Sequence, residues 1–397
     1  MRTFINQVLL LSCLSFVVSP SLIHAQEKSG IEDATKEDKK ESTKTKKNKR
    51  ANVDLAILLD TSNSMDGLIS QARTQLWNIV RQVADAEKKN QKPVLRVAVF
   101  EYGNNNLPAS ENYLRQVVPL TDDLDEVSAG LFALKTDGGD EYCGSVIQEA
   151  LRRLDWSTKK NGYKAIYIAG NEPFTQGKVD YTESCNAAIQ SGVVVNTIHC
   201  GNYERGVAGM WKHGADLAEG QFMNINQDQK IAQIKTPHDA ILIQLNVELN
   251  STYLWYGAST KRKALEQNQI LQDENSASAG SNLSRIATKA GSAYSNRGRD
   301  LVDSTREDAS LLSKIDVKLL PEVMQKMNAE QRKVHVKTMA TKRSEIQKKI
   351  AEATKKRDDF IAKQRESQSK EAAKTFGDAI SEAVESQLKK YGFEVRE

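Results

Sequence analysis

The chain has 397 residues, of which 39% are hydrophobic and 27% are charged. This is enough for one complete α/β domain together with a further region. The formal net charge of +4 is small for the length, and no face interleaves aromatic with basic residues. The composition therefore argues against a nucleic-acid-binding protein.

Residues 1–25 have the pattern of a cleavable signal peptide. Arg2 precedes an apolar core at residues 8–18, and Ala25 is a small residue at a suitable cleavage point. No other stretch of the sequence is long and apolar enough to span a bilayer. We therefore expect an exported protein without a transmembrane segment, either periplasmic or secreted.

Residues 26–50 are polar and charged and include no aromatic residue, which predicts a disordered linker. The end of this linker, KTKKNKR, carries only positive charge. We expect it to be a solvated tether, and contact with an acidic surface is the alternative.

The segment 53–64, VDLAILLDTSNS, is the most informative part of the chain. Its apolar run is typical of a strand buried in a parallel sheet, and such sheets place ligand sites beyond the carboxyl ends of their strands. Asp60, Ser62 and Ser64 follow there with the spacing D-x-S-x-S, and a helical apolar stripe begins directly afterwards. Carboxylate and hydroxyl oxygens suit Mg²⁺ or Mn²⁺ better than zinc or copper. An ordinary solvated turn is the alternative.

This pattern resembles the metal-ion-dependent adhesion site (MIDAS) of von Willebrand factor A-type (VWA) domains. In that family the two serines bind the ion directly, the aspartate acts largely through water, and a partner's carboxylate completes the coordination. The resemblance implies Mg²⁺, or Mn²⁺ or Ca²⁺, as the cofactor. It also implies a protein partner that engages the metal through an acidic side chain.

The family completes its ion site with two later loops, and both have counterparts here. In the first, KTDGGDEYCG at 135–144, Asp140 stands near the place where many VWA domains have a threonine, as in a bacterial variety of the domain. Thr136 is a candidate additional ligand. Gly138 and Gly139 permit positive φ and a close approach of the backbone.

The second loop departs from the family pattern, because Asn171 stands where most VWA domains have an aspartate. An amide oxygen can still accept a hydrogen bond from a metal-bound water, but it brings no charge. The departure therefore affects the expected affinity more than the geometry. The phrases IAGNEPFTQG and VNTIHCG, with the GGDEYCG loop before them, resemble a bacterial group of exported VWA proteins.

Strands and helices alternate from residue 51 to 235, which predicts a doubly wound, mostly parallel, Rossmann-like α/β sheet. The segment 113–118 is the expected antiparallel edge. From 236 to 397 apolar residues recur at helical spacing, so a mainly α-helical region is predicted there. Self-association through these C-terminal helices, or their packing on the VWA domain, would cover the apolar stripes.

Removal of the signal peptide would leave three cysteines, Cys143, Cys185 and Cys200. Exported proteins form disulfides, so one pair and one free thiol are expected, with Cys185–Cys200 as the candidate disulfide. Three buried free cysteines are the alternative.

Two classes of function follow from these features. The first is a non-catalytic module that uses the metal site for protein–protein interaction or adhesion. The alternatives are a metal-assisted hydrolase at the same loops and a structural or assembly factor acting through the helical tail. The histidines after the signal peptide are scattered, and neither H-E-x-x-H nor G-x-S-x-G occurs, so we predict that the protein is not an enzyme.

Overall fold

The computed structural model describes residues 50–226, 228, 234–366 and 376–395. The predicted signal peptide and the linker up to residue 49 lie outside the described residues. Within the described part of the chain, no helix is long and apolar enough to cross a membrane.

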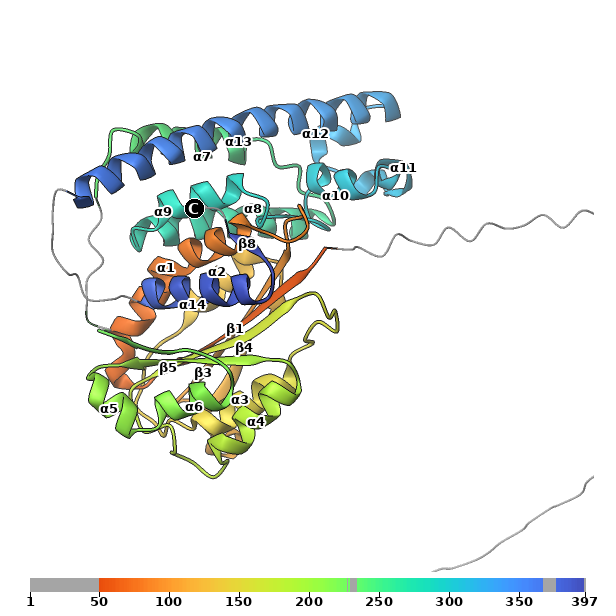
Figure 1. Cartoon of the computed structure of the whole chain (residues 1–397). Coiled ribbons are helices and arrows are strands. Elements are labelled where there is room, and N and C mark those ends of the chain that lie inside the picture. Colours follow the sequence, from red (N-terminus) through yellow and green to blue (C-terminus); the bar gives the residue numbers. More distant parts are fainter. Residues whose placement is uncertain (1–49, 227, 229–233, 367–375, 396–397) are drawn as a thin grey trace, which may run out of the picture. The chain divides into compact units, whose positions relative to one another are not determined.

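A six-stranded sheet forms the centre of the α/β part, in the order β4-β3-β1-β5-β6-β7 (Figure 1). Neighbouring strands are parallel except for β4, which pairs antiparallel with β3 at one edge as predicted. The strands have these bounds: β1 Asn52–Asp60, β3 Val94–Tyr102, β4 Leu114–Thr121, β5 Tyr163–Gly170, β6 Val194–Cys200 and β7 Phe222–Ile225.

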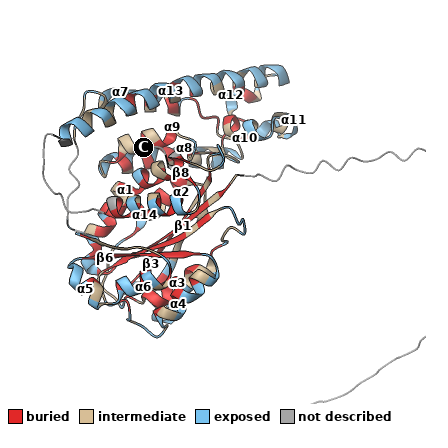
Figure 2. Ribbon diagram, viewed as in Figure 1, coloured by how far each residue is buried: buried red, intermediate tan, exposed pale blue. Residues whose placement is uncertain are grey.

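Helices cover both faces of the sheet, because the central strands bury side chains on both sides (Figure 2). One face carries α1 Asp66–Asp85, α2 Leu124–Ala133 and α14 Phe376–Lys390. The other carries α3 Cys143–Arg153, α4 Tyr181–Gln190, α5 Tyr203–Ala208 and α6 Trp211–Leu217. This confirms the predicted doubly wound α/β fold.

A mainly helical region follows β7, as the sequence predicted. The long helix α13 lies along α7 and α9 (Figure 1). The helices have these bounds: α7 Asp239–Asn250, α8 Ser259–Ser278, α9 Asn282–Ala290, α10 Leu301–Glu307, α11 Leu311–Lys314, α12 Glu322–Gln325 and α13 Ala329–Glu366. The capping box that begins α13 is formed by Asn328 and Gln331, which exchange hydrogen bonds of 2.8 and 2.9 Å.

The last helix, α14, returns to the sheet and packs against α1. Its first backbone N–H, at Phe376, donates to the Gln71 side chain of α1 at 2.8 Å. Near its end, the buried Gln387 donates to the Asn196 side chain of β6 at 2.6 Å and accepts from the Tyr163 hydroxyl of β5. A short antiparallel pair, β2 Ala86–Glu87 with β8 Glu394–Val395, follows. The C-terminal helix α14 therefore covers α1, the first α-helix of the α/β part.

Buried ion pairs also tie the helical region to the α/β layers. Arg285 of α9 is almost fully buried and bonds Asp125 of α2 and Asp273 of α8, each at 2.6 Å. Tyr294 donates to the second oxygen of Asp125 at 2.7 Å. A buried charge is tolerated only with such partners, so α2, α8 and α9 are held in one arrangement.

Polarity alone does not decide which side chains of these helices are covered. Gln272 and Ser276 are polar but buried in α8, where they bond Ser128 and Trp77. Ile241 of α7 is apolar but 51% exposed.

Candidate metal centre

Four loops meet beyond the carboxyl ends of β1, β3 and β5. Asp60 ends β1 and pairs with Tyr102 at the end of β3, while Leu59 pairs with Ala169 at the end of β5. The loop from residue 134 to 142 lies over these ends, because the Asp137 N–H donates to the Thr61 carbonyl at 2.9 Å. Parallel register therefore gathers the polar residues of the predicted site at one edge of the sheet.

Asp60 is the buried centre of this edge. One carboxylate oxygen, Oδ1, accepts a hydrogen bond from the Ser62 backbone at 2.8 Å. The other, Oδ2, is buried and has no hydrogen-bond partner among the described residues. Burial raises the pKa of Asp60 to about 7, against the lowering effect of the Ser62 hydrogen bonds and of the nearby Asn171 backbone N–H. A carboxylate in this setting needs either a proton or a cation.

Ser62 and Ser64 lie beside this carboxylate, as the D-x-S-x-S spacing predicts. Their hydroxyl oxygens are 3.2 Å apart. Ser62 is buried and Ser64 is exposed, so the pair reaches from the buried aspartate to the solvent. The three predicted residues of the first loop are therefore brought together.

The 135–144 loop contributes a different carboxylate from the predicted one. Asp140 is exposed and its Oδ2 accepts a hydrogen bond from the Tyr142 hydroxyl at 2.9 Å. Its neighbour Glu141 is buried, and burial followed by the charges of Asp60 and Glu172 raises the pKa of Glu141 to about 8. Glu141, which the sequence analysis missed, is thus the acid that faces Asp60.

Gly103 brings Glu141 and Asp60 into proximity. Its φ is +76°, and a Cβ atom built there would lie 2.7 Å from Glu141 Cγ and 2.9 Å from Asp60 Oδ1. Only a glycine permits this backbone conformation without strain and leaves space for both carboxyls. Gly139 makes the close approach expected of the paired glycines, but to the Gly103 carbonyl, 2.8 Å from its Cβ position, and without positive φ.

Asn171 opens the loop after β5, and its Oδ1 is buried without a hydrogen-bond partner in the described structure. Oδ1 of Asn171 and Oδ2 of Asp60 are thus two buried oxygen acceptors in need of a donor or a cation. A divalent ion with its bound water molecules fits these two oxygens and the serine hydroxyls. Nowhere in the described residues do three or more His, Cys, Asp or Glu side chains form a metal cluster by themselves. The candidate ligands are therefore oxygen atoms of three kinds: carboxylate, amide and hydroxyl.

Thr136, the candidate additional ligand, contacts a different residue. Its hydroxyl donates to Asp66, the first residue of α1. This hydrogen bond joins the 135–144 loop to the start of the helix. The structure therefore gives Thr136 a role in holding the loop.

The described cysteines, Cys143, Cys185 and Cys200, are all free and buried. Cys143 and Cys185 lie in the core on one face of the sheet, and Cys200 lies in the core on the other face. The candidate disulfide Cys185–Cys200 is thus not formed, because the sheet separates the two thiols. Burial raises the pKa of Cys185 to about 12, so this thiol is not reactive at neutral pH.

The α/β part is similar to one known family. Residues 54–229 match the family model of the von Willebrand factor type A domain. The VWA match ends just after β7, so the later helices and α14 lie outside it. None of the curated proteins matches the chain in sequence.

Several solved structures are similar to the VWA part. BatB from Bacteroides thetaiotaomicron has 17% identity over 44% of this chain and 91% of its own, with a TM-score of 0.34. Proximal thread matrix protein 1 of the mussel byssus, with a zinc-occupied MIDAS motif, has 13% identity over 45% and 43%, with a TM-score of 0.33. The vWF domain of the pilus tip protein Mfa5 from Porphyromonas gingivalis has 11% identity over 45% and 90%, with a TM-score of 0.33.

Proposed function

We propose that this protein is an exported, non-catalytic VWA module that holds a divalent cation and uses it to bind a protein partner. The cation site consists of Asp60, Ser62, Ser64 and Glu141, with Asn171 bound through water. The observation that carries the proposal is a pair of buried oxygens, on Asp60 and Asn171, that have no hydrogen-bond partner among the described residues and lie where the family motif meets the later loops.

The charge of the site supports a hard divalent cation. The charge of Asp60 raises the pKa of Glu141, and the charge of Glu172 raises the pKa of both, so several acidic groups repel one another in these loops. A cation offsets this repulsion. Because the ligands are oxygens only, Mg²⁺, Mn²⁺ or Ca²⁺ is the cofactor that we propose.

The carboxylate of Glu141 bears on the strength of partner binding. A direct protein carboxylate reduces the net charge of the ion and so weakens its attraction for a partner's acidic side chain. Ser64 is exposed beside the ion, so a partner can still approach from solvent. We therefore propose moderate, metal-dependent capture of a protein rather than tight anchoring.

A second candidate function is assembly through the helical region. α7 presents Ile243 and Val247 to solvent, 48% and 66% exposed, four residues apart on one face of the helix. Such residues favour a contact with another chain. Sedimentation analysis of Val247→Glu against the unchanged protein would test it, since an assembly through this face should dissociate.

Substitution of the site residues should change metal affinity in opposite directions. We expect Ser62→Ala to weaken Mn²⁺ or Mg²⁺ binding by about tenfold or more, because it removes a ligand without adding bulk. Asn171→Asp should tighten binding, because it restores a charge in place of a dipole. Isothermal calorimetry on protein treated with EDTA measures both.

Ser70→Ala is the matched control, since Ser70 is exposed on α1 and is not part of the site. Unchanged affinity in Ser62→Ala, with the fold intact by circular dichroism, would remove Ser62 from the site. Weaker binding in Asn171→Asp would mean that the side chain points away from the ion.

The proposed protein partner can be tested directly. A pulldown from the native envelope fraction with and without EDTA should show a partner that is lost when the metal is removed.

The predicted export has a separate test. Mass spectrometry of the mature protein should find a chain that begins near Gln26, and an uncleaved chain would contradict export by this signal.

A further inference from the structure

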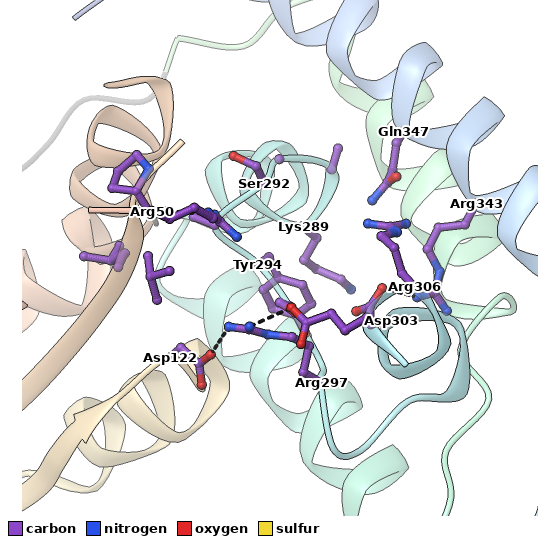
Figure 3. A pocket seen from close by; sticks show the side chains of 18 of the residues that line it. Arg50, Asp122, Lys289, Ser292, Tyr294, Arg297, Asp303, Arg306, Arg343 and Gln347 are labelled. Atoms are coloured by element: carbon purple, nitrogen blue, oxygen red, sulfur yellow. Dashed lines mark hydrogen bonds and ion pairs between the residues drawn. The ribbon is translucent and has the colours of Figure 1, made fainter. Parts of the chain in front are cut away.

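A pocket of about 380 Å³ lies at the opposite end of the strands from the candidate metal centre (Figure 3). Its floor includes Val94 and Leu95, at the start of β3, and Arg50, which precedes β1. The segment after α9, helix α10 and the middle of α13 provide its other walls. Its volume is within the range of sites for small organic molecules.

Positive charge is in excess around this pocket. Five basic and three acidic residues line it within the described chain: Arg50, Lys289, Arg297, Arg306, Arg343, Asp122, Asp303 and Glu307. All three carboxylates already pair with two of the arginines. Arg297 bonds Asp122 at 2.6 Å and Glu307 at 2.8 Å, and Arg343 bonds Asp303 at 2.9 Å. Lys289 pairs with Asp273, outside the lining, at 3.1 Å, and Arg50 donates to the Lys92 and Pro93 carbonyls. The acids of the lining are therefore all engaged by arginines other than Arg306.

Arg306 lines the pocket without a counter-ion among the described residues. Its side chain makes no hydrogen bond or ion pair to any described residue, and neither does the amide of Gln347. In Figure 3 the two side chains lie on the same side of the pocket, and Arg50 reaches in from the opposite side. A guanidinium with an adjacent amide offers several N–H donors to one group of oxygens.

Tyr253 adds a buried polar group to the same pocket. It is only 9% exposed, and its ring stacks on Trp255 with centroids 5.1 Å apart. Its hydroxyl forms no hydrogen bond within the described structure, although buried hydroxyls normally have a partner. The ring is held by stacking, so the hydroxyl is free to bond a ligand.

We propose that this pocket binds a small organic oxyanion, whose carboxylate or phosphate group is held by Arg306 and Gln347 and attracted by Arg50. The apolar part of the ligand packs on Val94 and Leu95, and a second oxygen-bearing group of the ligand bonds the Tyr253 hydroxyl. Charge-assisted bonds of this kind are the strongest that a side chain makes to an oxyanion. This site is independent of the metal centre and of the function proposed for it.

Calorimetry on the full chain with two probes, succinate and inorganic phosphate, tests the proposal. We expect at least one to bind, more weakly at higher ionic strength, and equally well with EDTA present. Arg306→Gln should weaken this binding by about tenfold to a hundredfold, because it removes a charged partner. Arg205→Gln is the matched control, since Arg205 is exposed on α5, outside the pocket.

Tyr253→Phe keeps the stacked ring and removes only the hydroxyl, so it should weaken binding of the organic probe, succinate, by a smaller factor than Arg306→Gln. Binding of phosphate alone would assign a phosphorylated ligand, and binding of succinate alone a carboxylate. Failure of both probes to bind, or equal affinity in Arg306→Gln and the unchanged protein, would overturn the proposal.

Discussion

Removal of α14 is expected to destroy the cooperative unfolding of the VWA part, although this helix lies more than a hundred residues beyond the family match. Phe376, Ile380, Val384 and Leu388 are each no more than 1% exposed and belong to the core that α1 shares. Burial of four such side chains contributes roughly 6–12 kcal/mol, as an upper estimate. Because whole domains are stable by only about 5–15 kcal/mol, this loss is decisive.

Two kinds of variant distinguish the loss of buried contacts from the mere shortening of the chain. A chain that ends at residue 375 should aggregate or lack a cooperative thermal transition. Single replacements Ile380→Ala and Leu388→Ala should each lower the unfolding free energy by about 2–5 kcal/mol. Lys390→Ala is the control on the same helix, since its ion pair with Glu219 is exposed and should contribute less than about 1 kcal/mol.

A stable, metal-binding chain that ends at residue 235 would contradict this prediction and would support the sequence-based division at that point. A chain that ends at 375 and unfolds, while the full chain is stable, would instead place α14 in the VWA domain. The residues between β7 and α14 would then be an insertion before the last helix of that domain.

Features that depend on neighbouring residues in the chain could be predicted from the sequence. The apolar run of β1, the motif that ends it and the buried stripe of α1 are local patterns, and the structure has all three. The sequence also predicts a mainly helical region from 236 to 397, and Ile380 and Val384 lie there, on α14. The packing of α14 against α1 was not predicted, because the spacing of apolar residues in a helix does not show which element covers them.

The choice between Asp140 and Glu141 shows the same limit within the site. The two acids are adjacent, and the sequence analysis chose the one that matched a family position. The backbone of Glu141 donates to the Gln176 side chain at 2.6 Å, and Gly103 leaves space for the Glu141 side chain beside Asp60. Both contacts come from distant parts of the chain. The cysteine pairing failed likewise, because the sequence does not say on which face of the sheet each thiol lies.

The metal-free protein is expected to lose stability as the pH rises, and the added metal to reverse this. The pKa of Asp60, about 7, and that of Glu141, about 8, are above the values near 4 of unfolded carboxyls. The native state therefore holds protons that the unfolded state has released. The resulting stabilisation is fully present below about pH 4 and is lost as the pH rises through about 7 to 8.

Urea unfolding in EDTA at about pH 5 and about pH 8 should show a fall on the order of 1.4 kcal/mol per pH unit for each carboxyl that is still protonated. With saturating Mn²⁺ or Mg²⁺ the ionised form is bound, so the difference should shrink or change sign. Glu141→Gln removes one of the two titrating groups and should flatten the profile of the metal-free protein, whereas Glu183→Gln, on the exposed face of α4, should not. A metal-free protein that becomes more stable from pH 5 to pH 8 would mean that both carboxyls are already ionised and balanced by a group other than a metal ion.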